Sequence, residues 1–290
     1  MGPFRLMLVR LLALFLLGSA AAAAHAAKPD TSSAVFVMQR DGSDVRRVVF
    51  IESFPRLSLP RWSPDGERLL FEAGGDRSPR SLVVDATGRN LLDLGLGVQA
   101  DWSPDGKQVV YAVPSESGPN VWVQNADGKA GTRLCPGSAP RWSPDGASIA
   151  VCGPLRLFDT FSGTLRALID AAAGVERTLG CAWSPDGERL AAIVERGDKR
   201  ELVVIDPTQV TRALDARWQA EFDGPPAWSP DGKHLAVTIH DPVADLRRIN
   251  VLEVEGDEPP RLIAGQQGDN RDPSWSPDSK QLAYIGTNPP

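Results

Sequence analysis

The sequence predicts an all-β protein: a six-bladed β-propeller with four antiparallel strands in each blade. Two observations carry this prediction. One pentapeptide, Trp-Ser-Pro-Asp-Gly, recurs along the chain at intervals of 40 to 47 residues, which is the period of a propeller blade. Each copy is followed by short β-type runs that are separated by polar turn residues, and this pattern is typical of antiparallel strands.

The pentapeptide occurs five times in full and a sixth time with serine in its last position. Its copies begin at Trp62, Trp102, Trp142, Trp183, Trp228 and Trp275. A repeat of this length cannot bury a hydrophobic face alone, so successive repeats stack on one another. In each repeat we expect one strand to end at the Trp, two strands to follow it, and a fourth to lead on to the next copy.

The pentapeptide itself has the composition of a tight turn. Its Pro presets φ for the first central position, Asp suits the second, and Gly supplies the left-handed residue that follows. The Asp can accept hydrogen bonds from the turn amides, and the Trp ring can fill the space between stacked sheets. The alternative is a ring of catalytic or metal-binding carboxylates, but each Asp is needed to close its own hairpin. We therefore interpret as structural the six Trp residues and Asp65, Asp105, Asp145, Asp186, Asp231 and Asp278.

The two ends of the repeat region complement each other. The last repeat supplies only a strand ending at Trp275 and a run over residues 281–285, whereas residues 34–50 have a strand-turn-strand pattern and precede the first Trp. We therefore predict that the last blade is closed by strands from both termini.

The first residues resemble an export signal. Arg5 and Arg10 precede an apolar run over residues 11–17, and Ala24-His25-Ala26 has the small-x-small pattern of a cleavage site. A short membrane anchor is the alternative, but the apolar run after Arg10 is too short to span a bilayer. The sequence thus predicts a signal peptide over residues 1–26 and the propeller over residues 27–290.

Composition limits the partners. The 290 residues carry a formal charge of −6, with a pI near 5.2, and nucleic-acid binding depends instead on clustered Lys and Arg. No apolar run reaches 20 residues, so a membrane span is not expected. We expect an exported monomer. We expect it not to bind nucleic acid and to have no helix that spans the membrane.

The sequence offers few groups for catalysis. It contains no Gly-x-Ser-x-Gly elbow, no HExxH motif and no phosphate-binding Gly loop. His234 and His240 lack a partnering Cys or carboxylate at metal-ligand spacing, so we predict no catalytic residue, metal or cofactor. The three cysteines allow two interpretations, a Cys135–Cys152 disulfide with Cys181 free or three buried thiols.

The central channel is the candidate binding surface, because the innermost strand of every blade faces it. The residue before each Trp is Arg61, Asp101, Arg141, Ala182, Ala227 or Ser274, and Arg271 and Asp272 add charge in the last blade. One hypothesis is that Arg61, Asp101, Arg141, Arg271 and Asp272 line one mouth of the channel and receive a partner peptide. The alternative is that Arg61, Asp101 and Arg141 pair with one another between blades.

The order Trp-Ser-Pro-Asp-Gly, a Leu-Ala-Phe-like strand, a Val-Asp-x-x-Gly turn and an Arg-Leu strand resembles the WD40-like (PD40) propeller repeat of the TolB family over residues 34–287. The resemblance implies a non-enzymatic scaffold in the bacterial periplasm that binds cell-envelope proteins. Since the repeats begin almost directly after Ala27, we expect no counterpart of the N-terminal α/β domain of TolB. A hydrolase or lyase acting on a carbohydrate or peptide at the channel mouth is the alternative function.

Overall fold

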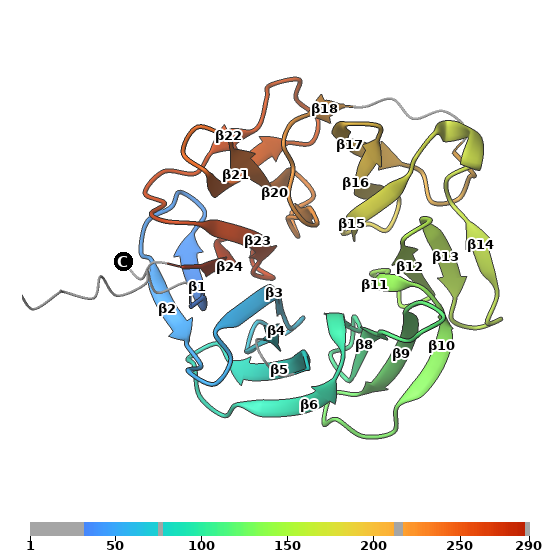
Figure 1. The fold of residues 1–290 in the computed structure, drawn as a ribbon, viewed down its shortest axis with the longest axis horizontal. Helices are drawn as coiled ribbons and strands as arrows, with labels where there is room; N and C mark the ends of the chain where they lie inside the picture. The colour runs from blue at the N-terminus through green and yellow to red at the C-terminus, as the bar shows by residue number, and fades with distance from the viewer. Residues whose placement is uncertain (1–31, 75–77, 212–216, 288–290) are drawn as a thin grey trace, which may run out of the picture. The chain divides into compact units, whose positions relative to one another are not determined.

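The computed structural model describes residues 32–74, 78–211 and 217–287, all within one compact unit, Thr31–Pro290. In this unit six antiparallel sheets of four strands follow one another around a central axis (Figure 1). The predicted six-bladed β-propeller is therefore confirmed. The predicted signal peptide lies outside the described residues.

Each of the first three blades is built from four strands that follow one another in the chain, from the innermost to the outermost. Blade one contains β3 (Arg56–Trp62), β4 (Arg68–Gly74), β5 (Arg80–Asp85) and β6 (Leu92–Leu96). Blade two contains β7 (Val98–Trp102), β8 (Gln108–Val113), β9 (Asn120–Asn125) and β10 (Thr132–Pro136). Blade three contains β11 (Ser138–Trp142), β12 (Ser148–Cys152), β13 (Arg156–Asp159) and β14 (Leu165–Ala167).

The other three blades have shorter outer strands or a different chain order. After the 3-10 helix η1 (Ala171–Ala173), blade four contains β15 (Arg177–Trp183), β16 (Leu190–Arg196), β17 (Lys199–Ile205) and β18 (Trp218–Gln219). Blade five contains β19 (Ala227–Trp228), β20 (His234–Asp241), β21 (Leu246–Glu253) and β22 (Arg261–Leu262). Blade six contains β23 (Asn270–Trp275), β24 (Gln281–Gly286), β1 (Ala34–Gln39) and β2 (Arg46–Val49).

Blade six joins the two ends of the repeat region. β1 pairs with β24 without interruption from Ala34 opposite Gly286 to Gln39 opposite Gln281, and β2 lies at the outer edge. The prediction that strands from both termini close this blade is confirmed.

The hydrophobic core is divided among the six interfaces between neighbouring blades. Among the described residues, six clusters of buried apolar side chains occur, and each draws its members from two adjacent sheets. The middle strands are buried on both faces, and because successive side chains point to opposite faces, one strand serves two clusters. In β12, for example, Ile149 and Val151 pack against blade two, whereas Ala150 and Cys152 pack against blade four.

Each repeat Trp packs against the blade that precedes its own. Trp102, for example, lies in the cluster between blades one and two. Its indole Nε1 donates a hydrogen bond of 3.3 Å to the carbonyl oxygen of Arg61. Trp183 and Trp275 make the corresponding bonds, at 3.1 Å each, to Arg141 and Ala227. The Trp rings therefore occupy the space between sheets, as the sequence predicts.

The Ser-Pro-Asp-Gly turns close the inner hairpins by one recurring network. In the first copy, the Asp65 carboxylate accepts hydrogen bonds from the Ser63 hydroxyl and from the Glu67 backbone N–H at 3.0 Å. Gly66 takes a positive φ of 73°, which favours glycine. The other five copies repeat the aspartate's two bonds, so the same network closes this turn in every blade.

Candidate functional site

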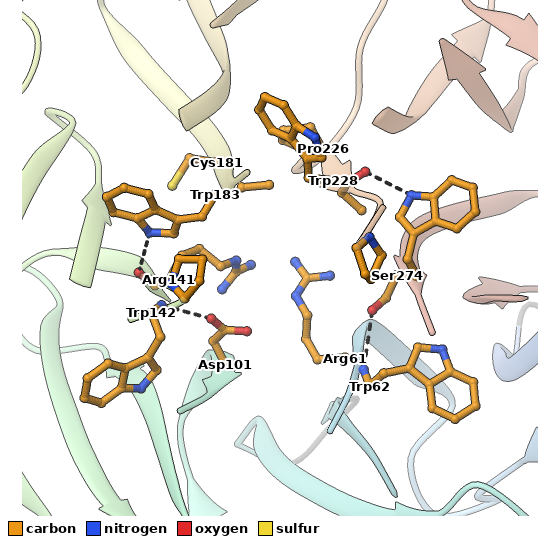
Figure 2. Close-up of a pocket in the computed structure, with 15 residues that line it drawn as sticks. Arg61, Trp62, Asp101, Arg141, Trp142, Cys181, Trp183, Pro226, Trp228 and Ser274 are labelled. Carbon is orange, nitrogen blue, oxygen red and sulfur yellow. Dashed lines mark hydrogen bonds between the residues drawn. The ribbon is translucent and has the colours of Figure 1, made fainter. Parts of the chain in front are cut away.

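A cavity of about 330 Å³ opens on the channel axis, where the innermost strands of all six blades converge. Its lining includes the residue before the Trp of every repeat: Arg61, Asp101, Arg141, Ala182, Ala227 and Ser274. A second cavity of about 290 Å³ shares Trp62, Asp101 and Trp142 with the first and extends among the Ser-Pro turns. The structure thus brings Arg61, Asp101 and Arg141 together in the lining of the first cavity (Figure 2).

A β-bulge in the innermost strand sets the direction of these side chains in four blades. The register to the second strand shifts just before Arg61, Asp101, Arg141 and Ser274. The residue two positions upstream has a positive φ in each case: Leu59, Gln99, Ala139 and Asp272. Bulges re-aim side chains and occur next to functional sites. Positive φ in residues other than glycine is uncommon and costs backbone energy.

Side chains of the preceding blade stabilise these bulges. The Leu59 N–H donates to the Asp272 carboxylate at 3.2 Å, and the Ala139 N–H donates to the Gln99 side-chain oxygen at 2.9 Å. The Gln99 N–H donates to Glu72, and the Asp272 N–H donates to the Thr238 hydroxyl at 3.1 Å. Each bulge is therefore held by a bond that crosses a blade interface.

Arg61 and Arg141 point toward one another across the cavity (Figure 2). Their relative exposures are only 8% and 5%. Arg61 Nη1 donates to the Pro60 carbonyl at 3.1 Å, and Arg141 Nη1 donates to the carbonyls of Gln99 at 3.0 Å and Pro140 at 2.7 Å. Burial and the neighbouring Arg141 charge lower the pKa of Arg61 to about 10, although Asp101, Asp272 and Glu72 oppose this shift. Arg61 therefore remains a cation at neutral pH.

Asp101 lies in the same wall of the cavity as Arg141, but its carboxylate bonds to the backbone of the next blade. Its carboxylate accepts a hydrogen bond from the Trp142 backbone N–H at 3.0 Å, and the Ser274 hydroxyl accepts the equivalent bond from Trp62 at 3.4 Å. Burial raises the pKa of Asp101, while the charges of Arg141 and Arg61 act in the opposite direction. Within the described part of the chain, no ion pair of 4.0 Å or less joins Asp101 to either arginine.

The cavity lining does not include Arg271 and Asp272, which the sequence hypothesis groups with Arg61. Arg271 donates to the Leu57 carbonyl at 3.2 Å and lies 3.9 Å from the Asp272 carboxylate, which in turn caps the Leu59 bulge. The two side chains thus bridge blade six to the bulged part of β3.

Sequence reasoning missed the buried groups behind the channel wall. Glu72, on β4, accepts hydrogen bonds from the Gln99 N–H and from the Ser58 hydroxyl at 2.9 Å, and burial raises its pKa. A signal was available, because Glu72 interrupts the apolar run Leu69–Ala73 and because Pro60, Pro140, Pro226 and Pro273 stand two residues before a Trp. Proline inside a strand indicates an edge or a bulge.

The structure decides between the two interpretations of the cysteines. The Cys135–Cys152 bridge is not formed, because Cys135 belongs to the cluster between blades two and three, whereas Cys152 belongs to the cluster between blades three and four. Cys152 Sγ lies instead 3.4 Å from Cys181 Sγ. All three cysteines are buried free thiols.

His234 and His240 each lie near an aspartate of their own hairpin. His240 Nε2 lies 3.0 Å from Asp245 in the β20–β21 hairpin, and His234 Nδ1 lies 3.7 Å from Asp231. In residues 32–74, 78–211 and 217–287, no group of three or more His, Cys, Asp or Glu side chains could hold a metal ion. That part of the chain also contains no helix long and apolar enough to cross a bilayer.

No protein-family model and no curated protein matches the sequence, but solved propellers match the fold. TolB from Acinetobacter baumannii superimposes with a TM-score of 0.72 at 16% identity, over 86% of this chain and 67% of that one. A protein from Agrobacterium tumefaciens provisionally described as TolB gives 0.71 at 20% identity, over 89% and 99%. The propeller domain of the Pyrococcus furiosus Trilobed protease gives 0.50 at 12% identity, over 80% and 83%. At these identities the likeness concerns the fold.

Proposed function

We propose that this protein is an exported, non-enzymatic scaffold of the bacterial cell envelope that binds protein partners at its channel or on the surrounding loops. The single observation that carries the proposal is the channel cavity, to which every blade contributes a residue and in which Arg61 and Arg141 face one another. All six blades contribute to this cavity, and preorganised sites bind at a lower entropic cost. The two TolB neighbours and the repeat's resemblance to that family support an envelope protein.

The alternative function is a hydrolase or lyase at the channel mouth, and one observation favours it. Asp101 lines the cavity and has a raised pKa, a property that catalytic carboxylates share. However, its carboxylate already accepts the Trp142 N–H. Among the described lining residues it is also the sole carboxylate, whereas a carboxylate pair is the usual arrangement for glycoside hydrolysis.

Affinity capture tests the proposal. A C-terminally tagged full-length chain would be produced in a Gram-negative host, captured from envelope extract, and compared with the Arg61→Glu/Arg141→Glu variant and with Arg133→Glu on exposed β10. We expect a partner that the wild type and Arg133→Glu retain and that the double variant loses. Any captured protein would then be purified and tested directly for binding to each variant. Failure of every purified candidate to bind the wild type would contradict the scaffold and favour a substrate screen.

Export is tested separately by fractionating the same cells. A mature chain that begins at Ala27 and is recovered in the periplasmic fraction is the expected result. An uncleaved chain that remains in the cytoplasm would contradict export.

A further inference from the structure

The two channel arginines are buried cations whose charge is not neutralised by direct contact. Among the described residues, each makes hydrogen bonds to backbone carbonyl oxygens, and neither lies within 4.0 Å of a carboxylate oxygen. A carbonyl dipole can orient a guanidinium, but it carries no full negative charge. Buried charges are usually paired, because desolvation is costly.

The arginines also retain hydrogen-bonding capacity. A guanidinium carries five N–H donors in a fixed planar fork, yet only Nη1 of each group is bonded among the residues that the structure describes. Both groups extend into the cavity rather than back into the wall (Figure 2). The free donors of two blades therefore face one shared space.

The carboxylates near the cavity already accept hydrogen bonds from backbone N–H groups. Asp101 accepts the Trp142 N–H, Asp272 accepts the Leu59 N–H, and Glu72 accepts the Gln99 N–H. These bonds stabilise the bulges and the innermost strands, so moving a carboxylate toward an arginine would leave a backbone N–H without its acceptor. The like charge of Arg141 contributes to the lowered pKa of Arg61, and an anion placed between the two groups would relieve that repulsion.

We infer that the cavity binds a carboxylate group of a peptide, held between the guanidinium groups of Arg61 and Arg141. This inference rests on the proposed function and specifies the chemistry recognised at its site. Guanidinium forks match the planar geometry of a carboxylate. A dianion such as phosphate fits less well, because Asp101 lies in the same lining.

The rest of the cavity suits the apolar part of a peptide. Trp62, Trp142 and Trp183 line it together with Pro226, and aromatic side chains provide contact area at little cost in conformational entropy. A carboxylate at a chain end, or on a short acidic side chain, could thus reach the arginines while the adjoining residues contact these rings.

The test uses the purified protein and three probes at constant ionic strength: N-acetyl-trialanine with a free C-terminal carboxylate, the same peptide as its C-terminal amide, and inorganic phosphate. Tryptophan fluorescence reports occupancy, because the cavity is lined by repeat Trp residues. We expect the free acid to bind at least tenfold more tightly than the amide and more tightly than phosphate. Equal binding of acid and amide, or tighter binding of phosphate, would overturn the inference.

Variants then locate the site. Arg61→Gln and Arg141→Gln should each weaken binding of the free acid about tenfold, whereas Arg133→Gln, on the exposed outer strand of blade two, should leave it unchanged. Melting curves establish that each variant is folded. If either channel variant fails to fold, the comparison of the acid probe with the amide probe on the unaltered protein still tests whether the cavity recognises a carboxylate. Unchanged affinity in folded channel variants would refute the site.

The outcomes separate this inference from the proposed function. A captured partner whose affinity is unaffected by the arginine variants, together with no preference for the acid probe, would remove the carboxylate site and keep the scaffold. Binding of the acid probe without any protein partner would keep the site and remove the scaffold.

Discussion

The carboxylate of Asp101 in blade two accepts the backbone N–H of Trp142 in blade three at 3.0 Å. Asp101 thereby connects two neighbouring blades at the wall of the channel, directly beside the Arg141 side chain. Ser274 makes the same kind of bond from blade six to Trp62 in blade one. In blades two and six, the side chain before the Trp therefore bonds to the next blade and also faces the cavity.

The stability of the fold should depend less on the charge of Asp101 than on its side-chain oxygen atoms. Asp101→Ala leaves the Trp142 N–H without its acceptor, and an unsatisfied buried donor costs about 1–3 kcal/mol. Asp101→Asn keeps a side-chain oxygen in place and serves as the matched control. Urea unfolding at pH 7 should therefore show a larger loss of stability for Ala than for Asn. Equal losses would mean that the bond contributes little.

Replacement by Phe should destabilise the fold more at Trp183 than at Trp142, although both Trp side chains are half-buried. Trp183 Nε1 donates to the Arg141 carbonyl at 3.1 Å, whereas the buried Nε1 of Trp142 has no hydrogen-bond partner among the described residues. Both substitutions remove the same atoms, so Trp183→Phe should cost about 1 kcal/mol more in the free energy of unfolding. Denaturant melts of the two variants measure the difference, and a reversed order would contradict it.

The turn aspartates should make the fold sensitive to acid. In five turns the serine hydroxyl is the largest cause of a lowered aspartate pKa, and at Asp231 burial opposes the same effect. A lowered native pKa stabilises the fold at a pH above the ordinary value of 3.8, and this contribution is lost as the pH falls below it. The melting temperature should therefore drop below pH 4, and less steeply in Asp145→Asn. Identical pH profiles would exclude this contribution.

The prediction from sequence succeeded where the pattern is local and periodic. The pentapeptide fixes a turn, a buried Trp and the start of the second strand, so blade number, blade closure and the channel position of Arg61, Asp101 and Arg141 could be read from spacing. Pro60 signals a bulge beside Leu59, but Asp272, which stabilises the positive φ of Leu59, belongs to another blade and could not be predicted as its partner. The neighbour of the Cys152 thiol depends on which face of β12 the side chain occupies. A short run of apolar residues does not reveal that face, because β12 is buried on both sides.

Closure of blade six should be essential to the whole ring. Deleting residues 28–50 removes β1 and β2, which leaves β24 as an unpaired edge, so we expect no cooperative thermal transition. A point variant gives a finer test. Val37 on β1 is 1% exposed and Val243 is 95% exposed, so Val37→Asp should lower the melting temperature strongly and Val243→Asp should not. Similar melting of the two variants would refute the prediction.

The thiols should be unreactive in the native state and selective when oxidised. The Cys152 sulfur and burial raise the pKa of Cys181, which keeps the reactive thiolate scarce, so alkylation at pH 8 should require urea. After refolding with oxidised and reduced glutathione, a disulfide should join Cys152 to Cys181, because their Sγ atoms lie 3.4 Å apart. Cys135 should stay reduced. Peptide mapping by mass spectrometry identifies the pair, and a bridge that includes Cys135 would contradict the assignment.

The pairing of β1 with β24 also affects the time at which the molecule can fold. β1 is synthesised before all the other described strands, and its partner β24 after all of them. Pairing between such distant segments is slow to form, and β1 presents an open edge until β24 arrives. The ring thus stays open until the whole repeat region from β1 to β24 has been synthesised.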